Sequence, residues 1–325
     1  MLIIPRQDNP HVYDDAFQLI RENNKYANET YVYEYDRYGN ITSKKTYAYT
    51  TGTLGAVTNT VTYTYGDESW GDLLTNYNGI NITYDAAGNP ENWRNADDIE
   101  WLESAGKQMS LIYDGDQGMY MYEYNIDNIR TKKTVYDEQG IDLLYESQYI
   151  LNETSIVRET RTYADESVVI LDFLYDDSDS IIGITYNGTT YYYRKNLGGD
   201  ITGIVNASGS VVVSYTYDSW GNPVSITGSM ASTLGEINPM RYRGYYYDTE
   251  TGFYYLQSRY YDPVVGRFIS PDDTAFLGAT GTTLSFNLFA YCENNAAVSA
   301  DYTGNFSTVY RICTRITSYR NYSYN

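Results

Sequence analysis

A short motif returns along this chain of 325 residues: Tyr, Asp, two variable residues, then Gly and Asn. The motif is complete at residues 35–40, 84–89 and 217–222, and altered copies occupy 65–72, 124–128, 136–140 and 175–183. A Tyr-rich alternating run puts every second side chain on one face of a strand, Asp starts a turn, and Gly-Asn tolerates positive φ. Each copy therefore predicts a strand, a tight turn and a returning strand.

These units must assemble, because one hairpin cannot bury its aromatic face alone. Further turns are predicted at residues 78–79, 187–188 and 207–209, between strand-like runs. Tyr occurs 41 times and favours strands. Because a long sheet coils or closes, we expect an all-β fold, a spiral or wrapped antiparallel sheet. An ordinary β-sandwich or propeller is the alternative, although WD-type and kelch-type spacings are absent.

Helical patterns are scarce in this sequence. One short helix is predicted over residues 14–22, which begin with acidic residues and carry Phe17 and Ile20 three positions apart.

Charge and residue counts exclude several functions. The 42 acidic and 22 basic residues give a formal net charge of −20, which repels nucleic acid and anionic membranes. Two Cys and one His, His11, cannot form a closed zinc site, and nothing around His11 suggests a catalytic triad. No apolar run reaches the 18 residues of a membrane-spanning helix. We expect no nucleic-acid partner, no membrane span, no metal and no cofactor.

The first residues, MLIIPRQD, lack the charged and long apolar regions of a signal peptide. We therefore expect either unconventional export or the tail of a longer product.

Two longer segments carry a family resemblance. Residues 238–272 read NPMRYRGYYYDTETGFYYLQSRYYDPVVGRFISPD, and residues 193–205 read YRKNLGGDITGIV. Together with the repeat they resemble the RHS (YD-repeat) family and its repeat-associated core domain, specifically over residues 191–304 and more weakly over 31–190. The resemblance implies a hollow β-sheet shell, as in bacterial polymorphic toxins and the C subunits of insecticidal toxin complexes. Such a shell encloses a variable C-terminal cargo, and the core domain plugs one end.

On this basis we divide the chain into four parts. These are an N-terminal segment (1–30), a YD-repeat β-sheet (31–235), the core plug (236–304) and a short variable tail (305–325). The repeat region holds roughly ten hairpin units of about 20 residues, so we expect a partial shell that a separate upstream polypeptide or further N-terminal sequence completes. The tail contains three Arg and no acid. It suits enclosure by an acidic shell, or it is only a polar terminus.

The resemblance further implies an aspartic-protease-like site that cuts its own chain just after a D-P-x-G motif. Matched position by position, the family's catalytic Arg is Arg259, its first Asp is Asp272 and its second is Asp301. Two neighbouring carboxylates share one proton, so that one acts as base on a water and the other as acid on the peptide carbonyl. We expect Arg259 to lower the pKa of the nearer carboxylate. The cut is expected near residues 304–307, with a cleavage region of Gly304, Asn305 and Phe306.

The same residues have a purely structural interpretation. Asp-Pro and Pro-Asp pairs form turns, and an Arg–Asp pair can simply hold the plug together. Asp262 and Asp273 lie close in sequence to the matched pair, and we expect Asp262 to shape a turn. Two positions depart from the family pattern: Tyr302 replaces the Pro after the second Asp, and residues 294–298 read NNAAV. Without Pro the scissile segment loses a fixed φ.

Cysteines and acidic turns complete the candidate sites. Cys292 and Cys313 lie on either side of the expected cut, so we expect free thiols rather than a disulfide. The acidic turns at residues 114–116 and 176–179 lack the closing Glu of a calcium loop and are expected to be solvated turns.

Three functions remain open at this point. The first is a toxin-delivery shell that encloses its own C-terminal cargo and releases it by self-cleavage, with an upstream shell polypeptide or delivery machinery as partner. The second is a cell-surface carbohydrate-binding or adhesion module, because Tyr-rich faces can stack on sugars. The third is a truncated, inactive fragment. The family resemblance implies a secreted or cell-surface location.

Overall fold

A computed structural model describes residues 11–102 and 107–305 and the backbone of 308–309. Most regular elements are strands, and within each sheet every strand pairs antiparallel with the strands adjacent to it in sequence. The prediction of an all-β chain of antiparallel hairpins is therefore confirmed. The first sheet has seven strands: β1 (His11–Tyr13), β2 (Leu19–Asn24), β3 (Glu29–Tyr35), β4 (Ile41–Ala48), β5 (Val57–Thr64), β6 (Asn76–Tyr77) and β7 (Ile80–Asn81).

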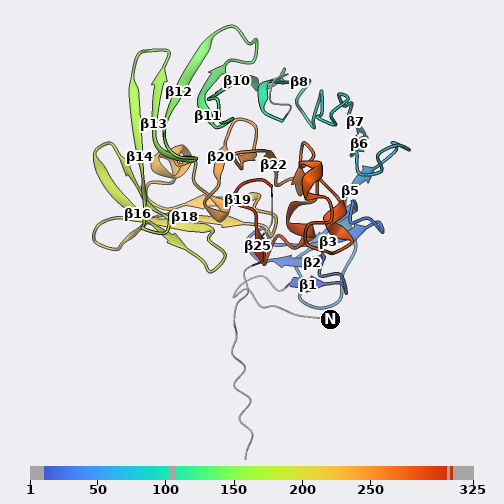
Figure 1. Ribbon diagram of the computed structural model, residues 1–325. Coiled ribbons are helices and arrows are strands. Elements are labelled where there is room, and N and C mark those ends of the chain that lie inside the picture. The colour runs from blue at the N-terminus through green and yellow to red at the C-terminus, as the bar shows by residue number, and fades with distance from the viewer. Residues whose placement is uncertain (1–10, 103–106, 306–307, 310–325) are drawn as a thin grey trace, which may run out of the picture.

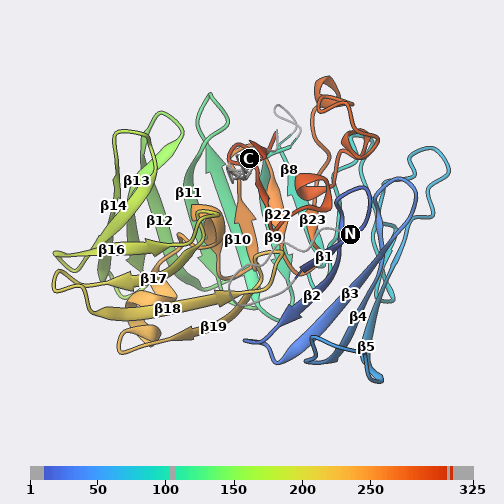
Figure 2. The ribbon, with the colours of Figure 1, turned by 90° about the horizontal axis from the view of Figure 1, so that it is seen from below.

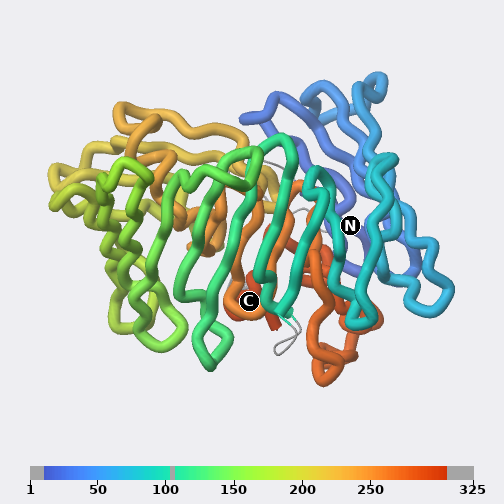
Figure 3. Tube along the Cα trace, turned by 90° about the horizontal axis from the view of Figure 1, so that it is seen from above, coloured from blue at the N-terminus to red at the C-terminus, as the bar shows by residue number. Residues whose placement is uncertain are grey.

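The second sheet has twelve strands, which run side by side in Figure 3. They are β8 (Asp98–Trp101), β9 (Met109–Asp114), β10 (Gly118–Tyr124), β11 (Arg130–Tyr136), β12 (Leu143–Asn152), β13 (Ser155–Tyr163), β14 (Val168–Tyr175), β15 (Ile181–Tyr186), β16 (Thr189–Lys195), β17 (Ile201–Val205), β18 (Val211–Tyr217) and β19 (Pro223–Thr227). The two sheets curve around the rest of the chain and form its wall (Figure 1).

The repeated motif forms one kind of turn. In the first complete copy, the Oδ1 atom of Asp36 accepts hydrogen bonds from the backbone N–H groups of Tyr38 and Asn40. Gly39 lies between them with φ +81°, a conformation that favours Gly. Asp85 and Asp218 make the same contacts in the copies at residues 84–89 and 217–222. Asp therefore serves as a local acceptor in the turn, and Asn takes the same role at position 125.

The Tyr of the motif fastens neighbouring strands. The hydroxyl of Tyr35 donates to the carbonyl of Leu19 at 2.6 Å, that of Tyr124 to Met109 at 2.7 Å, and that of Tyr217 to Ile201 at 2.8 Å. In each case the acceptor lies at the start of the preceding strand. Phe would fill the same space but would leave the carbonyl without this donor.

The helix predicted over residues 14–22 is wrong. Residues 14–18 form a turn in which Asp14 Oδ1 accepts the N–H groups of Ala16 and Gln18. Phe17 has φ +64°, which no α-helix tolerates, and β2 begins at Leu19. The acidic start therefore caps a turn rather than a helix, because an Asx turn offers the same side-chain acceptor to nearby N–H groups.

The core segment lies inside the curved wall. Its strands form a four-stranded antiparallel sheet, which is visible between the wall strands in Figure 2. The elements within residues 236–304 are β20 (Tyr246–Asp248), β21 (Phe253–Tyr255), β22 (Tyr260–Asp262), β23 (Arg267–Phe268), β24 (Ser299–Ala300) and the helical turns η2 (Tyr242–Gly244), η3 (Thr274–Phe276), η4 (Leu284–Phe286) and η5 (Tyr291–Asn294). The helical turn η1 (Ala231–Gly235) precedes this segment, and β25 (Thr308–Val309) follows it and pairs with β24. No helix among the described residues is long and apolar enough to span a membrane.

Buried ion pairs join the core to the wall. Arg130 of β11 is fully buried, and its Nη1 atom lies 2.7 Å from Asp248 Oδ2 in β20. Lys133 reaches the other oxygen of Asp248 at 3.1 Å. The Arg130 guanidinium also lies over four Tyr rings, those of Tyr122, Tyr149, Tyr246 and Tyr255. Such a charge is tolerated inside a protein because it is paired and faces aromatic rings.

The two sheets meet at a polar seam. Glu22 of β2 is fully buried, and both its oxygens accept the backbone N–H of Ser219 at 3.0 Å. The imidazole of His11 lies 2.5 Å from the Ser219 hydroxyl, and Lys44 lies 3.9 Å from Asp218. Burial, and then the charge of Asp218, raises the pKa of Glu22 to about 8. Burial also raises the pKa of Asp218.

Candidate functional site

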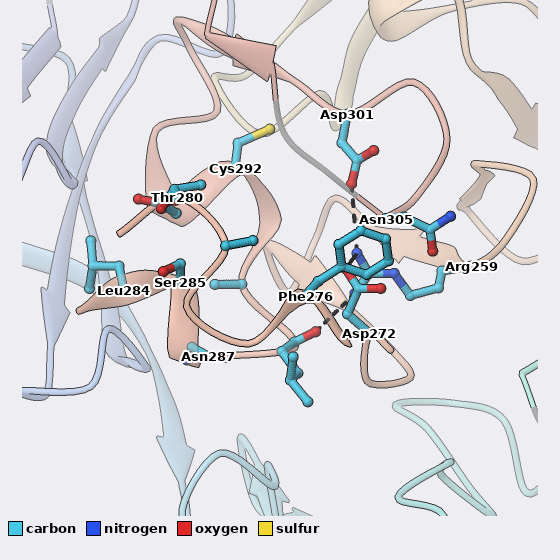
Figure 4. Close-up of a pocket in the computed structure, with 14 residues that line it drawn as sticks. Arg259, Asp272, Phe276, Thr280, Leu284, Ser285, Asn287, Cys292, Asp301 and Asn305 are labelled. Carbon is cyan, nitrogen blue, oxygen red and sulfur yellow. Dashed lines mark hydrogen bonds and ion pairs between the residues drawn. The ribbon is translucent and has the colours of Figure 1, made fainter. Parts of the chain in front are cut away.

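The core segment brings Arg259, Asp272 and Asp301 together. Arg259 lies directly before β22, Asp272 follows β23, and Asp301 directly follows β24. One atom of the Arg, Nη2, lies 2.9 Å from Asp272 Oδ2 and 3.6 Å from Asp301 Oδ2 (Figure 4). Both carboxylates therefore contact a single nitrogen inside the protein, where all three side chains are buried.

The remaining donors of Arg259 fix the guanidinium in place. Its Nη1 atom donates to the carbonyl of Leu288 at 2.8 Å, and its Nε atom donates to the carbonyl of Gly304. The guanidinium also lies over the Phe268 ring, 3.5 Å from its centre. A guanidinium held on this many sides can polarise the Gly304 carbonyl without moving.

Burial dominates the electrostatics of Asp272. It raises the pKa of this carboxyl above its usual value even though Arg259 lowers it. Burial also lowers the pKa of Arg259 against the opposing effect of the two carboxylates. Arg259 does lower the pKa of the nearer carboxyl, as expected, but the net shift of Asp272 is upward because loss of water outweighs the ion pair.

Asp301 and Gly304 form one tight turn. The Oδ1 atom of Asp301 accepts the N–H groups of Gly304 at 2.8 Å and Thr303 at 3.2 Å. Gly304 has φ +76°, and a Cβ there would lie 2.6 Å from Ser258 Oγ. Gly is therefore required at 304 for its conformation and for its close approach to the neighbouring turn.

A small cavity opens beside the carboxylates. It measures about 50 Å³ and is lined by Arg259, both Asp residues and Asn305, with further walls from residues 276–293. That volume has room for a water molecule next to polar partners. Of the predicted cleavage region, Gly304 and Asn305 therefore adjoin the carboxylates, whereas Phe306 lies outside the described residues.

The other predicted residues have structural contacts. Asp262 shapes a turn, as expected, by accepting the N–H of Val264, and its Oδ2 atom also binds Trp93 and Arg94 of the wall. Cys292 is a buried free thiol, and Cys313 lies outside the described residues. Within residues 11–102 and 107–305, no three His, Cys, Asp or Glu side chains gather into a metal-binding group.

Sequence reasoning missed two residues that contact the Asp301–Gly304 turn. The hydroxyl of Tyr245 accepts the backbone N–H of Asp301 at 2.8 Å. The hydroxyl of Ser258 donates to the carbonyl of Thr303 at 2.7 Å. Tyr245 was hidden among 41 Tyr residues. Ser258 carried one available signal, its place directly before Arg259.

The sequence matches one protein family and is similar to two bacterial nucleases. The family model described as Teneurin YD-shell matches residues 5–298. Over 248 residues, or 72% of the chain, the sequence is 33% identical to the tRNA3(Ser)-specific nuclease WapA of Bacillus spizizenii and 32% identical to the tRNA nuclease WapA of Bacillus subtilis. The matched part is 9% of each of these relatives. The chain thus corresponds to a small part of the curated relatives it matches.

Solved toxin structures share the fold. A crystal structure of TcdB2-TccC3-TEV matches 91% of the chain with a TM-score of 0.69 at 19% identity. The Photorhabdus luminescens Tc holotoxin pore matches 92% with a TM-score of 0.71 at 18% identity. The chain covers 15% of each of these two. At 18–19% identity, this similarity shows a shared fold.

Proposed function

Because the chain belongs to the teneurin YD-shell family, we propose that it is part of a toxin shell whose core cuts the chain beside Gly304. The family match, the sequence similarity to WapA and the fold shared with Tc toxin structures support its relation to toxins. One observation carries the cleavage proposal. A single guanidinium contacts both carboxylates and the carbonyl of Gly304 at the position where the cut is expected.

The proposed chemistry is hydrolysis of one peptide bond by water. Asp301, as carboxylate, takes a proton from the water as its oxygen attacks the Gly304 carbonyl carbon. In this proposal the proton that the pair shares is assigned to Asp272, whose pKa burial raises, and Asp272 supplies it to the carbonyl oxygen. Arg259 stabilises the negative charge that develops on this oxygen. When the C–N bond breaks, Asp301 passes the proton it took from water to the leaving amine, and Asp272 regains a proton from a hydroxyl of the tetrahedral intermediate. The products are a Gly304 carboxyl and an Asn305 amine, and both Asp residues return to their starting states.

The proposed cargo is the segment that follows the cut. In this proposal the acidic wall holds a C-terminal cargo that carries opposite charge, and release follows cleavage. The partners are then the cargo itself and an upstream shell polypeptide or delivery machinery. The toxin relatives support a secreted or cell-surface location as part of this proposal.

Intact mass spectrometry of purified protein tests the cleavage. Wild type is expected to yield a C-terminal fragment that begins at Asn305. Asp272→Asn and Asp301→Asn are expected to abolish that fragment because each removes one proton-transfer group. Asp273→Asn is the matched control, since Asp273 is an exposed neighbour that caps Ala275, and it is expected to cleave like wild type. Uncut wild type, or equal cutting in all variants, refutes the proposal.

A further inference from the structure

The turn at residues 301–304 needs external support to hold one conformation. Its central residues are Tyr302 and Thr303, and neither fixes the backbone as Pro would. Tyr302 is 42% exposed. A carbonyl that must face a fixed guanidinium benefits from a rigid turn, because misplacement by about 1 Å can cost two orders of magnitude in rate.

Contacts from two separate turns grip this backbone. Ser258 lies in the turn between β21 and β22, and both its backbone N–H and its hydroxyl donate to the Thr303 carbonyl, at 3.3 and 2.7 Å. Tyr245, directly before β20, accepts the N–H of Asp301 at 2.8 Å and lies 3.0 Å from the hydroxyl of Tyr291. Tyr291 thereby helps to anchor the Tyr245 hydroxyl.

The lack of a side chain at Gly304 completes the fit. The backbone at residue 304 approaches the 256–259 turn so closely that an added Cβ would lie 2.7 Å from the Leu256 carbonyl and 3.2 Å from the Arg259 nitrogen. Tyr302 also contacts Tyr245 edge-on, with ring centres 6.1 Å apart. The turn at residues 301–304 therefore packs closely against the turn at residues 256–259.

We propose that Ser258 and Tyr245 are positioning residues that clamp the Asp301–Gly304 turn so that the Gly304 carbonyl stays on Arg259. Neither side chain contacts the reacting carbonyl; each acts through the backbone of the turn. As a contribution to cleavage, the inference rests on the proposed function. The claim that the two residues hold the turn depends only on the observed contacts. Hydrogen exchange tests this claim, and the cleavage rate tests the contribution to cleavage.

Hydrogen–deuterium exchange measures the clamp without cleavage. In an Asp272→Asn background, which keeps the chain intact, the amides of Thr303 and Gly304 are followed. Ser258→Ala removes one hydrogen bond to the turn and is expected to speed their exchange about five- to tenfold. Ser258→Thr keeps the hydroxyl and is expected to restore protection, and Tyr245→Phe is expected to behave like Ser258→Ala. Amides of β12 and β13 serve as the internal control.

Cleavage is then measured in the wild-type background. Ser258→Ala is expected to slow the fragment's appearance about five- to tenfold without moving the pH profile, because Ser does not titrate in this range. Unchanged exchange at 303 and 304, or exchange that rises equally in β12 and β13, overturns the clamp. If wild type is never cut but Ser258→Ala still loosens the turn, the proposed function fails and the clamp stands.

Discussion

The buried carboxyl of Glu22 makes the seam between the two sheets sensitive to pH. Its pKa of about 8 in the folded protein lies above its usual value of 4.5. Between these values the folded chain binds a proton at Glu22 that the unfolded chain has lost, so the contribution of this carboxyl to stability falls as pH rises. One pKa unit corresponds to about 1.4 kcal/mol. The expected loss from pH 5.5 to pH 8 is therefore about 3 kcal/mol.

Glu22→Gln isolates this effect, because Gln resembles the protonated carboxyl and cannot ionise. Glu22 faces the carboxyl of Asp218 and the ammonium group of Lys44, and it accepts hydrogen bonds from the Ser219 N–H and the Asn24 side-chain amide. The carboxyls of Glu22 and Asp218 therefore titrate as a pair. Urea unfolding at several pH values, followed by Trp fluorescence, measures the free energy. Trp220, which contacts Tyr33 beside the seam, is a local reporter.

The expected result is a difference in slope. From pH 5.5 to pH 8, wild type is expected to lose about 3 kcal/mol more than Glu22→Gln, and the two proteins are expected to be similar in stability at pH 5.5. Glu100→Gln, a change at an exposed position in β8, is the matched control and is expected to follow wild type. Parallel pH profiles for wild type and Glu22→Gln would refute the argument, because they would mean that Glu22 titrates at an ordinary pKa.

Three further changes test the packing of wall and core. Arg130→Met leaves Asp248 buried with a weaker partner set, so we expect about 3–5 kcal/mol less stability in urea unfolding. Gly221→Ala places a Cβ 2.5 Å from Tyr242 at φ +91°, and a melting temperature at least several degrees lower is expected by calorimetry. Tyr217→Phe removes the donor to the Ile201 carbonyl and is expected to cost about 1–3 kcal/mol in the same urea assay. An unchanged midpoint in any of the three contradicts the contact concerned.

The sequence predicted the parts of the fold that depend on local chemistry. The complete motif beginning at Tyr35 implies its own turn, because Asp36, Gly39 and Asn40 satisfy one another within six residues. The pair Asn187-Gly188 likewise joins β15 to β16 with both residues at positive φ. The misassigned helix came from the same local chemistry, since an acidic N-cap and an Asx turn share one signature.

The residues of the candidate site could be predicted from the family motif, but their pKa shifts could not. Arg259, Asp272 and Asp301 were matched by family pattern, and they do meet. The direction of the pKa of Asp272 was not predictable, because it depends on how much water burial removes. The polar seam between the two sheets was also not predictable, because Glu22 and Ser219 are 197 residues apart and no sequence pattern indicates their contact.

The contacts between core and wall also set an order of events during synthesis. Asn294 donates to the Gly39 carbonyl, 255 residues earlier, and Arg130 of the wall is synthesised before its partner Asp248 in the core. Because a ribosome releases the wall strands first, the interior that receives the core can exist before the core is translated. Pairing over such sequence distances is slow. The three clustered side chains, at residues 259, 272 and 301, therefore meet only after every wall strand has been synthesised.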